Sequence, residues 1–190
     1  MENGLKWYII KATYGREKQG ADYLASKGIK AISPSVTKIK ADDESDESVK
    51  EYSLPNLFFA QGTEQTLKPL VERNPEADYL RFYCRYYNEG GKRRRQIITI
   101  PQTQMNSFLK ICEAKDLDLR IYNEVIHKFD KGKCVRVIEG PYQGVEGRAI
   151  RIFGQQRVGV VIDDILTAVT SYVPSAYLEK LDEQQGMGKS

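Results

Sequence analysis

The sequence has few of the residues on which many catalytic and metal sites depend. Its only histidine is His127, and its three cysteines are Cys84, Cys112 and Cys134. No two cysteines form a Cys-x-x-Cys pair, which argues against a disulfide framework or a zinc site and favours a reducing compartment. His127 has no serine, cysteine or carboxylate motif beside it that would complete a catalytic triad. We therefore expect no enzyme activity, no cofactor and no metal.

The sequence also lacks a long apolar run and a strong net charge. No window approaches the roughly 18 apolar residues that a membrane helix needs, and no apolar stretch follows basic residues at the N-terminus, so we expect no signal peptide. The 29 basic and 26 acidic residues give a net charge of only +3. That balance argues against a uniformly basic, DNA-wrapping protein, so any nucleic-acid contact must come from a local patch. We expect a cytoplasmic protein of one ordinary domain or two small ones, without membrane contact.

The stretch 131–147 is the most informative part of the chain and predicts a strand, a tight turn and a second strand. Pro141 presets φ for a turn, while Gly140 and Gly144 provide positions where a positive φ is free of strain. Gly147 falls early in the second strand, where a missing side chain marks a bulge or a close backbone approach. The second strand is expected to extend over 148–153, and two further strands are expected at 158–162 and 166–173. Short strands with turn signals about ten residues apart predict a small all-β barrel.

The first half of the chain interleaves strands and helices, which predicts an α+β sandwich around a mostly antiparallel sheet. Strands are expected at 7–10, 29–39, 54–60, 79–87, 97–100 and 120–125, and helices at 16–26, 66–73 and 101–114. Thr63 is a candidate cap for the second helix, and Gly28 a stop signal for the first. Acidic residues and serines fill 40–51, which predicts a mobile loop because nothing there can bury apolar surface.

The strand at 54–60 is apolar on both faces. Leu57 and Phe59 point to one side, and Phe58 and Ala60 point to the other. One face must meet the core of the domain, whereas the other needs either a covering helix or a partner protein. The pattern alone favours a strand covered by the domain's own helices, whereas the resemblance described below implies an exposed docking surface at Leu57 and Phe59.

A hairpin is expected at 88–91, followed by the basic run 92–95. Because a run of four basic residues is a weak signal, it can be either a solubilising hairpin tip or a nucleic-acid contact. Tyr14 and Arg16 are likewise either ordinary helix-start residues or nucleic-acid contacts.

Three signals that occur in order along the chain resemble NusG-type transcription elongation factors. They are the aromatic-led strand at Trp7, the Pro55-Asn56 turn that feeds an apolar strand, and the 131–147 stretch, which resembles the KOW motif. The Pro-Asn turn is similar to specialised paralogues of the RfaH type. Further residues resemble the UpxY-type antiterminators, namely Pro101, Met105, Phe108 and Ser171-Tyr172-Val173-Pro174.

The resemblance implies a domain plan and a non-catalytic function. An NGN-like polymerase-binding domain would cover 1–118, a connector 119–130, an SH3-like KOW barrel 131–182 and a tail 183–190. The first domain would dock on the clamp of RNA polymerase and suppress pausing or termination, while the KOW domain recruits a further partner.

The resemblance also assigns residues to three contacts. These are Lys11, Leu57 and Phe59 toward RNA polymerase, Tyr14 and Arg16 toward upstream or non-template DNA, and Ile165 and Leu166 toward a ribosomal protein or Rho. Where NusG proteins have a Phe-Gly-Arg-like sequence, this chain has Asp164-Ile165-Leu166-Thr167. The alternative function is that of a KOW protein that binds RNA or the ribosome, which a steep salt dependence of rRNA binding without polymerase affinity would favour.

Overall fold

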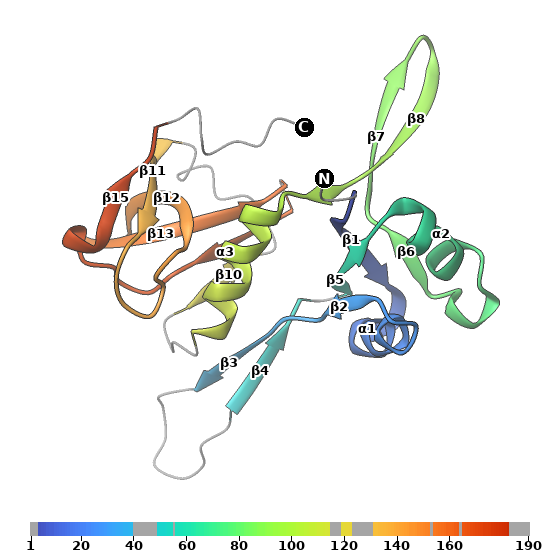
Figure 1. Ribbon diagram of the computed structural model, residues 1–190, viewed down its shortest axis with the longest axis horizontal. Coiled ribbons are helices and arrows are strands. Elements are labelled where there is room, and N and C mark those ends of the chain that lie inside the picture. Colours follow the sequence, from blue (N-terminus) through green and yellow to red (C-terminus); the bar gives the residue numbers. More distant parts are fainter. Residues whose placement is uncertain are drawn as a thin grey trace. The chain divides into compact units, whose positions relative to one another are not determined.

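Figure 1 shows the chain in a computed structural model, which describes residues 4–39, 49–54, 56–114, 119–122, 131–152, 154–163 and 165–182. The chain divides into two units. The first comprises Met1–Pro34 and Ser53–Pro101, and the second comprises Ser35–Tyr52 and Gln102–Ser190. This division differs from the predicted boundary at residue 118, because the helix that follows Pro101 belongs to the second unit.

The first unit is built on a five-stranded antiparallel sheet with the order β2-β5-β1-β6, in which β9 also pairs with β1. Its strands are β1 (Lys6–Ala12), β2 (Lys30–Ile32), β5 (Leu57–Gly62), β6 (Leu80–Phe82) and β9 (Thr99–Ile100). The central strands β1 and β5 are apolar on both faces. Tyr8 and Ile10 point to one side and Trp7 and Ile9 to the other, and all four are buried. The predicted strand at 7–10 is thus confirmed.

Helices α1 (Glu17–Ser26) and α2 (Glu64–Glu72) bury their apolar sides in one core with a face of this sheet. The core includes Leu24 of α1, Leu67 and Val71 of α2, and Tyr8, Ile10 and Phe58 of the sheet. A Cβ atom at Gly20 would lie 2.8 Å from Leu80 and Phe58, so the glycine allows α1 to approach the sheet closely.

Both predicted helix-end signals in this unit are confirmed. Thr63 caps α2: its Oγ1 accepts a hydrogen bond from the Thr66 N–H at 3.2 Å, and the Thr63 N–H donates to Thr66 Oγ1 at 3.1 Å. Gly28 follows α1 with φ of 78°, a backbone conformation that a glycine adopts without strain.

Strands β7 (Cys84–Glu89) and β8 (Lys92–Ile97) form a separate two-stranded hairpin in the first unit, which extends away from the five-stranded sheet (Figure 1). The predicted turn at 88–91 is confirmed, with Gly90 and Gly91 both at positive φ. The single strand expected over 79–87 is two strands, because the chain leaves the sheet near Tyr83. The Tyr83 N–H still donates to the Ile9 carbonyl at 2.8 Å, and among the described residues β7 then pairs only with β8.

The predicted acidic loop at 40–51 needs a correction at its end. Strands β3 (Ser35–Ile39) and β4 (Val49–Ser53) form a two-stranded sheet, so Val49 to Glu51 belong to a strand. Residues 40–48 lie outside the described part of the chain.

The second unit contains a six-stranded antiparallel sheet with the order β10-β14-β13-β12-β11-β15. Its strands are β10 (Arg120–Tyr122), β11 (Lys133–Val137), β12 (Glu146–Ile152), β13 (Gln155–Ile162), β14 (Leu166–Val169) and β15 (Leu178–Lys180). The strand–turn–strand prediction for 131–147 is confirmed: the Gly144 N–H donates to the Val137 carbonyl at 2.7 Å, and Gly140 and Gly144 have positive φ. A Cβ atom at Gly147 would lie 2.5 Å from the Gly159 carbonyl oxygen, which confirms the close backbone approach.

Helix α3 (Gln102–Glu113) packs on β12 and β13 of this sheet. Its apolar residues Met105, Phe108 and Ile111 are buried. Ser107 Oγ accepts a hydrogen bond from the Glu146 N–H at 2.9 Å, and Lys110 Nζ donates to the Gln143 carbonyl at 3.0 Å. These bonds join the helix to the turn and strand that follow β11.

Candidate nucleic-acid interface

The loop between β1 and α1 holds its most exposed side chain on a left-handed backbone. Tyr14 is 91% exposed and has φ 60° and ψ 36°, within a short 3-10 turn over Thr13–Gly15. For an L-residue with a Cβ atom this conformation costs about 1–2 kcal/mol, which is why glycine is the usual choice. Since little of the Tyr14 side chain is buried, packing of that side chain does not offset the strain.

The neighbouring turn before β5 holds this loop in place and is itself left-handed. Asn56 has φ 60°. Its backbone carbonyl accepts from the Ala12 N–H at 2.9 Å, and its side-chain Oδ1 accepts from the Gly15 N–H at 3.0 Å. Two strained non-glycine residues thus meet at one surface site, a pattern that clusters at functional sites.

Arg16 lies at the base of the same loop, over the ring of a buried tyrosine, Tyr79. Its guanidinium carbon is 3.9 Å from the centre of the Tyr79 ring and 5.9 Å from that of Tyr14. Its Nε donates to the Thr13 carbonyl at 3.4 Å. Burial raises the pKa of the Tyr79 hydroxyl, and the positive charge of Arg16 opposes that rise. The arginine is therefore oriented before any ligand arrives, and it lies beside the ring of Tyr14, which is open to solvent.

Lys11 and Leu57 lie side by side where β1 and β5 meet this loop. They are direct partners in the antiparallel register, and Lys11 also pairs with Arg81 of β6. Lys11 and Arg81 are exposed and Leu57 is half-buried. The Lys11 Nζ lies 5.1 Å from the centre of the Tyr83 ring. These residues form a small surface, basic with an apolar edge, next to Tyr14.

Phe59 does not share that exposure, although it lies on the same face of β5 as Leu57. Its side chain has no exposed area. Phe59 pairs with Ile9 of β1 and Ile32 of β2, so it lies in the middle of the sheet, whereas Leu57 lies at the end of its strand. The predicted contact of Lys11, Leu57 and Phe59 with RNA polymerase stays a prediction.

Ile165 and Leu166 lie at the start of β14, after the turn that leaves β13. The Ile165 N–H donates to the Ile162 carbonyl at 2.9 Å. Leu166 is fully buried and pairs with Ile162, so its side chain belongs to the core of the second unit and not to an exposed loop. Ile165 is half-buried and remains the accessible member of the predicted pair.

The three cysteines are free thiols. Cys134 is buried in β11, and Cys84 and Cys112 are half-buried. Burial raises the pKa of the Cys112 thiol to about 12, with the Glu113 carboxylate adding to the effect. No group of histidine, cysteine or carboxylate residues that could hold a metal ion occurs within the described ranges. His127 lies outside those ranges, and none of the helices they contain is both long and apolar enough to cross a membrane.

Sequence reasoning proposed Tyr14 and Arg16 as candidates but missed the residues that position them. Asn56 and Tyr79 are 41 and 66 residues away from their hydrogen-bond partners in the loop. The Pro55-Asn56 dipeptide is a turn signal and could have marked Asn56 as a residue that tolerates positive φ. No local signal identifies Tyr79 as the surface on which Arg16 lies.

No protein-family model matches the chain, and no curated protein matches it. Among solved structures the chain is similar to "Domain interaction in Thermotoga maritima NusG", at 19% identity and a TM-score of 0.41, over 94% of this chain and 98% of that one. A likeness at this TM-score carries no argument about function.

Proposed function

We propose that this protein is a cytoplasmic transcription elongation factor of the NusG type, which binds RNA polymerase and suppresses pausing or termination without catalysis. The observation that carries the proposal is the strained β1–α1 loop, which holds Tyr14 in solvent beside a fixed Arg16. Such strain persists only where the surroundings enforce it, and it is typical of sites that contact a ligand. The sequence resemblance assigns the same two residues to DNA at the upstream fork.

The chemistry of the two side chains suits DNA that is partly unpaired. An exposed aromatic ring stacks on an unpaired base, which contributes about 1–3 kcal/mol per base. The guanidinium of Arg16 keeps donors for a phosphate oxygen while its plane rests on Tyr79. The loop would therefore hold one base and the phosphate next to it, without reading a sequence.

The polymerase contact would lie directly beside this loop. Lys11 and Leu57 form the accessible part of the predicted surface, and Arg81 extends it. Phe59, which lies on the same face of β5 as Leu57 and is buried in the structure, would be the third residue of this contact. In the second unit, Ile165 would contact the further partner, a ribosomal protein or Rho, and Leu166 would hold its turn in place.

An in vitro pausing assay with purified RNA polymerase tests the proposal. The wild-type protein should shorten pauses, and Tyr14→Ala should weaken this effect by roughly 5- to 150-fold in the concentration required, the equivalent of one stacked base. Tyr172→Ala is the matched control, since Tyr172 is also an exposed tyrosine, at 54%, but lies in the second unit.

Two results would contradict the proposal. Equal activity of Tyr14→Ala and wild type would remove the loop from the DNA contact. Absence of both polymerase binding and any effect on pausing, together with salt-sensitive rRNA binding, would establish the alternative of an RNA- or ribosome-binding KOW protein.

A further inference from the structure

The β7–β8 hairpin concentrates the positive charge of the molecule. Residues 84–97 contain five basic side chains and one acidic side chain, Glu89, for a net charge of +4. The whole chain has a net charge of +3, so the remaining residues together carry −1. The basic residues are Arg85, Lys92, Arg93, Arg94 and Arg95. This one element is therefore the local patch that a nearly neutral chain needs in order to bind a polyanion.

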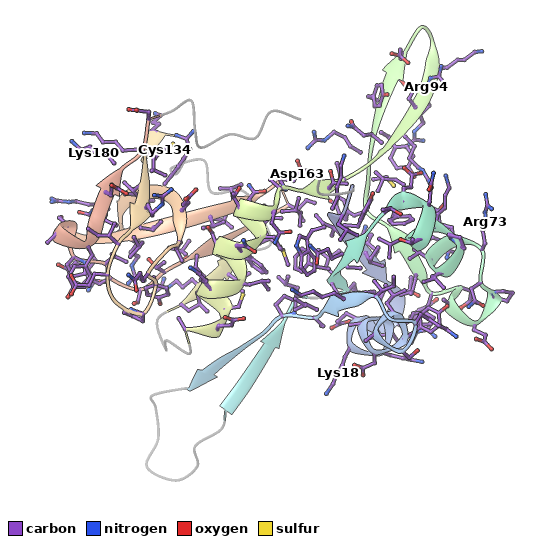
Figure 2. All side chains as sticks on the ribbon, in the orientation of Figure 1. Lys18, Arg73, Arg94, Cys134, Asp163 and Lys180 are labelled. Carbon is purple, nitrogen blue, oxygen red and sulfur yellow. The ribbon has the colours of Figure 1, made fainter. Side chains whose placement is uncertain are left out.

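The antiparallel register distributes these charges over both faces of the ribbon. Directly paired residues share a face, so Arg93 and Arg95 lie with Tyr86 on one face, and Lys92 and Arg94 lie with Tyr87 on the other. Every residue from Arg85 to Gln96 is exposed. Arg94 lies on the part of the hairpin that projects from the first unit (Figure 2). Positive charge is thus presented to both sides at once.

The hairpin is anchored at its base and open toward its tip. Cys84 and Ile97 pack against the core of the first unit, and Arg95 pairs with Glu72 of α2 at 2.9 Å. Nearer the tip, the Arg93 guanidinium lies 4.5 Å from the centre of the Tyr86 ring. The Arg94 pair with Glu89, at 3.3 Å, is solvent-exposed at both side chains, and such pairs are weak, so a phosphate can displace the carboxylate.

We propose that the β7–β8 hairpin is a binding element for double-stranded DNA that enters the major groove and contacts the phosphates on both sides. Six paired residues per strand give a ribbon about 20 Å long, and the major groove of B-DNA, about 12 Å wide, admits a two-stranded ribbon. Cations on both faces match a groove with a phosphate backbone on each wall. A single strand would instead use open aromatic faces, and the Arg93 side chain already covers one face of Tyr86. This inference is independent of the proposed function, because it needs no polymerase.

The full-length protein and a short fluorescent B-DNA duplex of arbitrary sequence test it, by anisotropy at several salt concentrations. With three phosphate contacts, from Lys92, Arg93 and Arg94, the logarithm of the association constant should fall against that of the salt concentration with a slope near −3. The variant K92Q/R93Q/R94Q should lose most of the affinity and most of this slope. The matched control K27Q/R73Q/K180Q removes three exposed cations elsewhere and should keep at least half of the wild-type affinity.

The thermal unfolding midpoint of the triple variant should equal that of the wild type, because all three side chains are exposed. If the midpoint of the triple variant is lower, the single variant R93Q replaces it. For R93Q the salt slope of the association constant should be near −2. The proposal is overturned if the triple variant binds the duplex as well as the wild type does, or if the control loses as much. It is also overturned if single-stranded DNA or an RNA duplex of equal length competes better than the B-DNA duplex, since the A-form major groove is too narrow for a ribbon.

Discussion

At position 14, glycine should support a more stable fold than alanine, which is the reverse of their usual order. Tyr14 has φ 60°, where a residue with a Cβ atom costs about 1–2 kcal/mol. Glycine removes that strain but loses about 0.5–1 kcal/mol in chain entropy. Tyr14 is 91% exposed, so truncating its side chain has little further effect. Tyr14→Gly should therefore exceed Tyr14→Ala in unfolding free energy by about 0.5–1 kcal/mol.

Urea unfolding, monitored by tryptophan fluorescence, measures this difference in unfolding free energy for the first unit. Trp7 is the only tryptophan, is fully buried and lies on β1, the strand that leads into the loop. Tyr87 of β7 is the matched control, because it is also an exposed tyrosine of the first unit and has no positive φ. There alanine should be the more stable replacement by about 0.5–1 kcal/mol. If alanine is at least as stable as glycine at position 14, the loop holds no strain, and the observation that carries the proposed function is lost.

Three further substitutions or reagents test other parts of the structure. Phe59→Ala should lower the unfolding free energy by about 3–5 kcal/mol in the same fluorescence experiment, and an effect no larger than that of Leu57→Ala would contradict its burial. Gly147→Ala should destabilise the second unit by about 1–3 kcal/mol or more, because its Cβ would meet the Gly159 carbonyl oxygen; an unchanged circular-dichroism melting curve would refute the close approach. Burial raises the pKa of the Cys112 thiol to about 12, so its alkylation by iodoacetamide should still be rising about tenfold per pH unit at pH 10. A plateau near pH 9, measured by peptide mass spectrometry, would contradict that shift.

The parts of the fold that depend on neighbouring residues in the sequence could be predicted well. The Gly90-Gly91 hairpin, the Thr63 cap and the turn around Gly140 and Gly144 each follow from the conformational preferences of a few adjacent residues. Gly147 belongs with these, because a glycine inside a strand already indicates that another backbone lies close.

The sequence could not show which apolar surfaces the fold covers. Alternation along β5 places Leu57 and Phe59 on the same face, yet in the structure Leu57 is half-buried and Phe59 has no exposed area. The burial of Leu166 could not be predicted either, since it depends on the pairing of Leu166 with Ile162 in a neighbouring strand. The hydrogen bond that holds the candidate loop also joins residues far apart in the sequence, because Asn56 accepts it from the Gly15 N–H, 41 residues earlier.

The isolation of β7 and β8 has a consequence for the behaviour of the protein in concentrated solution. In the part of the chain that the structure describes, these strands pair only with each other, so each has an outer edge whose peptide groups are open to another strand. Mutual repulsion between the arginines of neighbouring molecules opposes such pairing. Neutralising them, by mutation or by a polyanion, should therefore promote edge-to-edge self-association, and the low-salt, high-concentration behaviour of the triple glutamine variant should reveal it first.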